Sequence, residues 1–378
     1  MNSPTQKRDR GLILTPEGRQ KLQAAIDRLG VSQKYVIGKI VEKIQLNNET
    51  LHRDTVDNIV EGRKASKSSL KVLFEALKLN LDQGDYVVAR ANQPADSNES
   101  ETSPFITGNP ITNPRCFFGR EKELKRLFNL IKRKPLQNAA IIGKKRSGKT
   151  SLLQYLKNIT TTPIEKLRPN QKSDWLPNPE NYRWIFVDFQ DSRLQNREGL
   201  LRYILECLKM AVPNPCDLDR FMDVVSYNLH QPTVILLDEI GVGLQRCPEL
   251  DDGFWESLRS LATNQTNGNL GFILAAPESP IELASSTGHS SPFFNIFGYT
   301  TTLGAMTESE ARELISSSPI PFPDEDVEWI LNQSKCWPLL LQILCRERLF
   351  SLEEGETGDD WQEEGLEQLK PFADLQSK

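Results

Sequence analysis

The sequence predicts an α/β fold, a three-layer parallel sheet that is preceded by an all-helical bundle and followed by a small helical or winged-helix-like subdomain. Short apolar runs alternate with helical patterns in the middle of the chain, as they do when a parallel sheet lies between helices. A glycine-rich loop joins the first apolar run to a helix. Residues 12–86 and the residues after Thr307 instead carry the apolar periodicity of helices.

The glycine-rich loop, residues 143–150, has the complete pattern G-x-x-x-x-G-K-[ST]. An apolar strand at 138–142 precedes it and a helix from 151 follows, which is the context that a phosphate-binding loop requires. Backbone N–H groups and the helix dipole would hold phosphates, Lys149 would reach the β and γ phosphates, and Thr150 would ligate Mg²⁺. For Arg146 two interpretations are equally open, a phosphate contact and a solvated charge. The predicted nucleotide contacts here are Gly143, Lys144, Lys145, Arg146, Ser147, Gly148, Lys149, Thr150 and Ser151.

A second signal is an acidic pair that follows the apolar run at 233–237. This run is apolar enough for a central strand buried on both faces. Asp238 and Glu239 end this run. Ligands of open α/β sheets bind beyond the carboxyl ends of the strands, so the pair should lie beside the phosphate loop. We expect Asp238 to hold Mg²⁺ and Glu239 to act as general base for an attacking water. The alternative is a solvated acidic pair at a strand end.

The composition is that of a soluble globular protein of two or three domains, with 378 residues, 38% hydrophobic and 26% charged. The chain has no apolar stretch long enough for a membrane span and its first ten residues are polar, so we expect a cytoplasmic protein without membrane contact. Six cysteines without C-x-x-C pairs and three scattered histidines indicate free thiols and no structural zinc.

Charge is distributed unevenly along the chain. Residues 1–90 carry a net charge of +5 and the remainder −10, within a total of −5. The segment 351–378 contributes nine acids against Lys370 and Lys378. A basic front end indicates a partner that is anionic, whereas the acidic surface is equally consistent with a purely solubilising role.

The residues 48–64 read as a helix, a tight turn and a second helix that ends at Gly62, and another helix starts near Ser68. This pattern resembles the phage-repressor type of helix-turn-helix domain, which presents a recognition helix to duplex DNA. The candidate DNA contacts are Arg53, Thr55, Asn58, Arg63 and Lys64. Acidic residues on the same helix would repel phosphate, so a protein-docking or oligomerisation bundle is the open alternative.

These patterns divide the chain into five segments. We expect a helical domain at 1–88, a linker at 89–115, a nucleotide-binding core at 116–304, a helical lid at 305–350 and an acidic C-terminal tail at 351–378. Within the core, strands are predicted at 184–188, 271–275 and 299–303 in addition to the two above.

Five short motifs occur in an order that resembles the STAND-type signalling ATPases, AAA+-like relatives of the origin-recognition ATPases. They are residues 118–121, the loop 143–150, the strand end 236–239, residues 303–311 and residues 337–342. The resemblance covers about residues 104–350. It implies a P-loop NTPase core of the AAA+/ASCE type that binds ATP with Mg²⁺.

The resemblance also implies roles outside the phosphate loop. Phe118, Gly119 and Arg120 match the box that lines the adenine pocket, and Pro338 matches the proline of a Gly-x-Pro motif in the lid. Here Cys336 stands where that glycine is expected. Glu278 and Ser279 are the candidates for sensing the γ phosphate. No arginine finger can be assigned beyond Arg246 and Arg259, so we expect slow ATP hydrolysis to ADP and phosphate.

Three functions are compatible with these patterns. The leading one is an ATP-operated switch in which nucleotide state controls homo-oligomer assembly or contact with an effector protein. The first alternative is a DNA-binding regulator, of the transcription or transposition type, whose ATPase controls oligomerisation. The second alternative is an adaptor that binds ATP or ADP without hydrolysis.

Overall fold

The computed structural model describes residues 12–28, 40, 51, 53–60, 65, 67–82, 85–88, 104–356 and 358–375. The chain divides into two compact units, residues 1–100 and 101–378. None of the described helices is long and apolar enough to cross a membrane.

The described elements of the first unit are three helices and a two-stranded antiparallel sheet. Its elements are β1 (Leu12–Leu14), α1 (Pro16–Asp27), α3 (Arg53–Val60), α4 (Lys67–Ala76) and β2 (Tyr86–Val88). β1 pairs with β2, a feature that the all-helical prediction for this region did not include. The core contains side chains from all three helices, among them Leu22, Val56 and Phe74. Lys21 joins α1 to the segment before β2 through ion pairs with Asp82 and Asp85, both at 2.8 Å.

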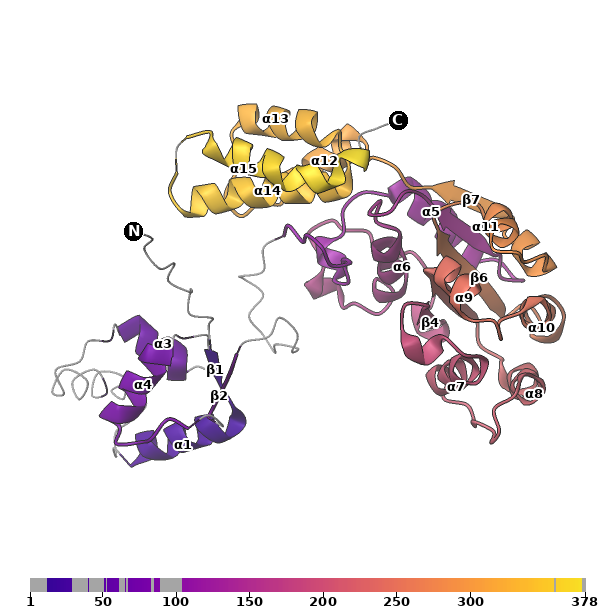
Figure 1. The fold of residues 1–378 in the computed structure, drawn as a ribbon, viewed down its shortest axis with the longest axis horizontal. Coiled ribbons are helices and arrows are strands. Elements are labelled where there is room, and N and C mark those ends of the chain that lie inside the picture. Colours follow the sequence, from indigo (N-terminus) through magenta and orange to yellow (C-terminus); the bar gives the residue numbers. More distant parts are fainter. Residues whose placement is uncertain are drawn as a thin grey trace, which may run out of the picture. The chain divides into compact units, whose positions relative to one another are not determined.

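The second unit is built on a parallel sheet, of which Figure 1 labels β4, β6 and β7. The sheet has five strands in the order β4-β5-β6-β3-β7. All five predicted strands are present. They are β3 (Ala139–Ile142), β4 (Arg183–Asp188), β5 (Thr233–Asp238), β6 (Leu270–Ala276) and β7 (Tyr299–Thr302). Every residue of β5 and β6 is buried, as expected for strands covered on both faces.

Helices cover both faces of this sheet, which makes three layers. Alternate residues of β5 point to opposite faces: Val234 and Leu236 join one core, whereas Ile235 and Leu237 join the other. The first core is shared with α5 (Glu121–Ile131) and α6 (Lys149–Asn158). The second core is shared with α7 (Arg197–Leu208), α8 (Leu218–Asn228), α9 (Ile240–Arg246), α10 (Asp252–Ser260) and α11 (Pro280–Ser286). The predicted three-layer parallel fold is thereby confirmed.

The residues after β7 form a helical lid. Its elements are α12 (Glu308–Ile315), α13 (Asp324–Ser334), α14 (Pro338–Glu353), α15 (Asp360–Leu369) and the 3₁₀ segment η8 (Lys370–Leu375). α12 begins with a capping box, in which Thr307 and Glu310 bond each other's backbone N–H groups. The described part of residues 305–375 contains helices and no strand, so this subdomain has no β wing.

The segment predicted as an acidic tail is folded and belongs to the lid. Trp361 and Leu369 of α15 are buried in the lid core, and Leu375 of η8 is buried there as well. α15 approaches α14 so closely that a Cβ on Gly365 would lie 2.8 Å from Leu344. Four of the nine acids, Asp360, Glu363, Glu364 and Glu367, lie on the side of α15 that faces away from this core. The end of the predicted linker is folded too, since Phe105 is buried in the same lid core.

Candidate nucleotide-binding site

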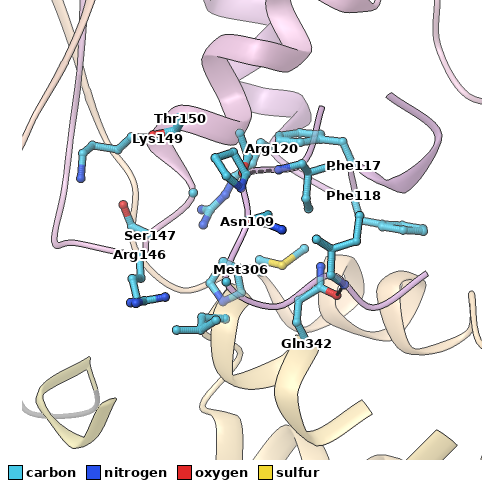
Figure 2. Close-up of a pocket in the computed structure, with 18 of the residues that line it drawn as sticks. Asn109, Phe117, Phe118, Arg120, Arg146, Ser147, Lys149, Thr150, Met306 and Gln342 are labelled. Atoms are coloured by element: carbon cyan, nitrogen blue, oxygen red, sulfur yellow. Dashed lines mark hydrogen bonds between the residues drawn. The ribbon is translucent and has the colours of Figure 1, made fainter. Parts of the chain in front are cut away.

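A cavity of about 290 Å³ lies between the phosphate loop, the start of α6 and the lid. Figure 2 shows Lys149 and Thr150 at one end of it and Phe117, Phe118 and Gln342 at the other. The predicted residues that line it are Phe118, Arg120, Lys145, Arg146, Ser147, Gly148, Lys149, Thr150, Ser151, Glu239 and Pro338. Gly119, Gly143, Lys144 and Asp238 are not among the lining residues.

The loop takes its shape from two glycines that are special for different reasons. Gly143 has φ 153°, and a Cβ there would lie 2.5 Å from the carbonyl oxygen of Leu303. Gly148 has φ 93° and is the N-cap of α6, with open space around it. α6 begins directly after it at Lys149, so the first N–H groups of the helix have no partner within the helix. The loop thus presents the donors and the dipole that bind phosphate.

Lys149 is held by the loop itself. Its Nζ donates to the carbonyl oxygens of Gly143 at 2.8 Å and Lys144 at 3.1 Å. Burial lowers the pKa of Lys149, while the nearby Glu239 and Asp238 act in the opposite direction. A phosphate at the loop would replace weak carbonyl acceptors with a charged one, which favours the ammonium form.

The acidic pair lies beside this lysine, as the strand pattern predicts. Asp238 ends β5 and is buried, and the Thr150 side chain lies near its carboxylate. The pKa of Asp238 is raised to about 6, mainly by burial; Thr150 acts in the opposite direction, and the neighbouring Glu239 and Asp188 contribute to the increase. Glu239 has φ 53°, begins α9 and lines the cavity with Lys149.

Thr150 and Asp238 fit a magnesium ion that arrives with a nucleotide. The hydroxyl of Thr150 lies near the carboxylate of Asp238, and both are oxygen ligands of the kind that Mg²⁺ takes. The raised pKa of Asp238 means that its surroundings, with Lys149 included, disfavour the negative charge, which a divalent cation would stabilise. Elsewhere in the described chain, no cluster of three or more His, Cys, Asp or Glu side chains could hold a metal.

The residues predicted to line the adenine pocket do not all do so: Phe118 lines the cavity, whereas Gly119 packs against the lid. Phe118 lines the cavity and stacks on the guanidinium of Arg168 at 3.8 Å, and Phe117 stacks on Tyr155 at 4.4 Å. Gly119 has φ 69° and packs where a Cβ would lie 2.9 Å from both Met306 and Glu310. These contacts join the box to both the core and the lid.

Arg120 serves the hinge between core and lid. Its guanidinium donates to the carbonyl oxygens of Gly304 and Ala305 at 2.5 and 3.3 Å. Its backbone N–H donates to Glu310 at 2.6 Å, and the second carboxylate oxygen of Glu310 caps α12. Burial lowers the pKa of Arg120. The residue lines the cavity, yet its charge is directed to backbone carbonyls.

Cys336, which stands in place of the glycine of the Gly-x-Pro motif, still has a backbone conformation typical of glycine. Cys336 has φ 58°, the left-handed conformation that favours glycine. Its carbonyl oxygen accepts the N–H of Met306 at 2.8 Å, and its own N–H donates to Ser334 at 3.2 Å. Pro338 follows as the first residue of α14 and lines the cavity.

A strap from Phe105 to Thr112 connects lid and core beside the cavity, and sequence analysis assigned it to the linker. Its lid end is held where the N–H of Ile106 donates to Gln342 at 2.9 Å. Its core end is held where the N–H of Ile111 donates to Ser151 at 3.1 Å. Lining residues that the sequence reasoning missed are Ile106, Gly108, Asn109, Pro110, Ile111, Phe117, Met306, Leu314, Leu339 and Gln342. For Gln342 a signal existed, because it stands one helical turn after Pro338.

The C-terminal segment η8 contacts the tip of the phosphate loop. The guanidinium of Arg146 lies 4.8 Å above the ring of Phe372, and Nζ of Lys144 donates to the carbonyl oxygen of Asp374 at 3.2 Å. Arg146 is exposed, has φ 67° and lines the cavity. It therefore faces both the cavity and the C-terminal segment.

The remaining candidates lie away from the cavity lining. Ser279 caps α11 and bonds Glu282, and Glu278 accepts a hydrogen bond from Ser286 at 2.9 Å. Arg246 and Arg259 are exposed on α9 and α10. Of the candidate DNA contacts, Arg53, Thr55 and Asn58 belong to α3, with Thr55 half-buried. Arg63 and Lys64 lie outside the described residues.

Sheet order, phosphate loop and acidic strand end together define a P-loop NTPase core of the AAA+ type with a helical lid. The sequence matches no protein-family model and no curated protein.

Solved structures share the fold. The Walker-type ATPase PABY2304 of Pyrococcus abyssi is 17% identical, with a TM-score of 0.50 over 71% of this chain and 77% of that chain. The ORC2 protein of Aeropyrum pernix, solved as ADPNP–ADP complexes, is 14% identical, with a TM-score of 0.52 over 70% of this chain and 71% of that one. At such identities the likeness is one of fold.

Proposed function

We propose that this protein is an ATP-binding switch that hydrolyses ATP slowly, of the STAND type. The observation that carries the proposal is the cavity itself, which is lined by Lys149 of the phosphate loop on one side and by Pro338 and Leu339 of the lid on the other. A nucleotide there would contact two parts of the fold that are joined at Gly304 and Ala305. The ORC2 structures, solved with ADP and ADPNP, support an adenine nucleotide as the ligand.

The residues at the phosphate end can perform hydrolysis. Lys149 would neutralise charge on the β and γ phosphates, and Glu239 would orient the attacking water and accept its proton. Thr150 and Asp238 would hold Mg²⁺, which supplies charge neutralisation between the phosphates. The bond from water oxygen to the γ phosphorus forms as the bond to the bridging oxygen breaks, leaving ADP and phosphate.

Slow turnover is supported by the arginines around the cavity. Among the described lining residues only Arg120 and Arg146 are arginines. Arg120 is bound to hinge carbonyls and Arg146 is exposed beside Phe372. Neither is aimed at a γ phosphate as an arginine finger would be. Nucleotide occupancy would then persist long enough to set the position of the lid.

The direct test is a comparison of two neighbouring lysines. Lys149→Ala should weaken MgATP binding about 100-fold, since it removes charge-assisted hydrogen bonds to phosphate. Lys145→Ala removes an exposed cation from the rim and should cost no more than about threefold. Titration calorimetry measures both. Equal affinities of Lys149→Ala and the wild type would refute the site.

The catalytic assignment and the switch need separate readouts. Glu239→Gln should bind MgATP as the wild type does but release phosphate about 10² to 10⁴ times more slowly. Mass photometry with ADP and with a non-hydrolysable ATP analogue should show different assembly states. Identical mass distributions would leave an ATPase without the proposed switch.

The second candidate function, a DNA-binding regulator, is favoured by the net charge of +5 on residues 1–90 and by the presence of α3 and α4. A DNA contact through several Lys and Arg side chains must weaken steeply as salt rises. Duplex DNA binding across a salt series, with and without ATP, tests it. Absence of binding at low salt would eliminate this candidate and favour the docking role of the N-terminal bundle.

A further inference from the structure

Gln342 lies at the end of the cavity opposite the phosphate loop. It follows Pro338 by one turn of α14, so both side chains lie on the same side of the helix and both line the cavity. The residue is only 5% exposed, which is unusual for a glutamine in a lid helix. A buried amide at a cavity wall needs partners for both its ends.

The orientation of the Gln342 amide is fixed by chemistry. The backbone N–H of Ile106, which can only donate, points to Oε1 at 2.9 Å. Nε2 is therefore the other end of the amide and carries two donor hydrogens. Among the described residues, the bond from Ile106 is the sole hydrogen bond of this side chain.

The position of Gln342 selects one edge of a bound purine. Figure 2 shows Lys149 and Thr150 at the phosphate end and Gln342 on the opposite side of the cavity. In a nucleotide the phosphates are connected through the sugar to N9 of the base, so the N1–C6 edge points away from the phosphates. Phe117 and Phe118 supply apolar contact at this end but no groups that read a base edge.

We propose that Gln342 is a specificity-determining residue for adenine, and that its Nε2–H donates to N1 of the base. The inference rests on the proposed nucleotide-binding function and adds the residue that chooses the base. Adenine N1 is an acceptor, whereas guanine N1 carries a hydrogen. Guanine would place two donors against each other and leave a buried amide unpaired, which costs about tenfold or more in affinity.

The assignment is tested with three nucleotides, on the wild type and on a variant of Gln342. Dissociation constants for MgADP, MgGDP and Mg-1-deaza-ADP, which lacks N1, are measured by calorimetry on the full chain. The wild type should bind ADP about tenfold more tightly than either of the others. Gln342→Met, which keeps the length and shape of the side chain, should bind ADP and 1-deaza-ADP equally.

Gln342→Glu should reverse the preference between ADP and GDP, a result that loss of folding cannot produce. One carboxylate oxygen can still accept the N–H of Ile106, while the other presents an acceptor to the cavity. The carboxylate should therefore favour GDP over ADP, through N1–H of guanine. A residue with a purely structural role would weaken both nucleotides by the same factor.

The outcomes separate this inference from the function on which it rests. If the wild type binds ADP but Gln342→Met keeps its preference over GDP and 1-deaza-ADP, the role of Gln342 is refuted and the nucleotide site stands. If the folded wild type binds no adenine nucleotide, both are refuted. Loss of the ADP preference in Gln342→Met together with its inversion in Gln342→Glu would establish the assignment.

Discussion

The phosphate end and the base end of the cavity are built in opposite ways. The phosphate end is built around one contiguous stretch, residues 143–151, with the acidic pair of β5 beside it, and the shape of the loop comes from backbone conformation. The base end is assembled from the strap, the box at 117–120 and two lid helices, which are joined by hydrogen bonds across up to 236 positions of sequence. The first end is local and rigid, and the second depends on how lid and core meet. Changes at the two ends should therefore have different signatures.

The largest effect is expected at Gly143. Gly143→Ala places a Cβ 2.5 Å from the carbonyl oxygen of Leu303 at a φ that side chains avoid, so the free energy of unfolding should fall by about 3–5 kcal/mol. Gly148→Ala is the matched control, because it has positive φ but open space, and it should cost about 1–2 kcal/mol. Urea denaturation of both variants measures the difference. Equal losses would mean that the contact with Leu303 does not define the loop.

A pH series isolates Asp238 at the phosphate end. Its folded pKa of about 6 lies above the 3.8 of an unperturbed aspartate, so the folded state binds the proton more tightly. Its stabilising contribution is complete below pH 4 and is lost as pH rises through 6, a decrease of about 3 kcal/mol.

Measured without Mg²⁺ or nucleotide, Asp238→Asn should remove this decrease. The variant should gain stability relative to the wild type between pH 4 and pH 7. A wild-type minus variant difference that stays flat over this range would contradict the burial of an uncompensated carboxylate.

Arg120 gives the corresponding test at the base end. Arg120→Ala removes charged donors from the carbonyl oxygens of Gly304 and Ala305, and we expect a loss of about 2–3 kcal/mol in the free energy of unfolding. Hydrogen exchange should increase at the hinge and at the start of α12. Arg120→Lys keeps the charge without the planar fork and should recover part of the stability. If exchange increases evenly over the whole unit, Arg120 has no particular role at the hinge.

This contrast also explains what the sequence could predict. The phosphate loop, the acidic pair and all five strands were predictable because each depends on a continuous local pattern, such as the apolar run of β5. The strap and Gln342 depend on contacts between distant segments, which no local pattern encodes. β1 and β2 are three residues each, too short for periodicity to appear.

The segment 351–378, predicted as an acidic tail but folded in the lid, lies between the predictable and the unpredictable parts. Its nine acids indicated a solvated segment, yet Trp361, Gly365 and Leu369 follow one another at intervals of four and form one buried face of α15. A helical period was therefore present beneath the charge. The position of η8 against the phosphate loop was not predictable in the same way, since it depends on where the lid places its last residues.

The smallest effect is expected where the last segment of the lid contacts the phosphate loop, at Phe372. Phe372→Ala removes the ring beneath the guanidinium of Arg146, an exposed cation–π contact worth about 0.5–1 kcal/mol. Hydrogen exchange of residues 370–375 should accelerate by about two- to fivefold, while the affinity for MgADP changes by less than that. Phe372→Tyr, which keeps an aromatic face, should retain wild-type exchange. If Phe372→Ala and Phe372→Tyr exchange alike, the ring does not hold η8 on the loop, and other contacts do so, among them the hydrogen bond from Nζ of Lys144 to the carbonyl oxygen of Asp374.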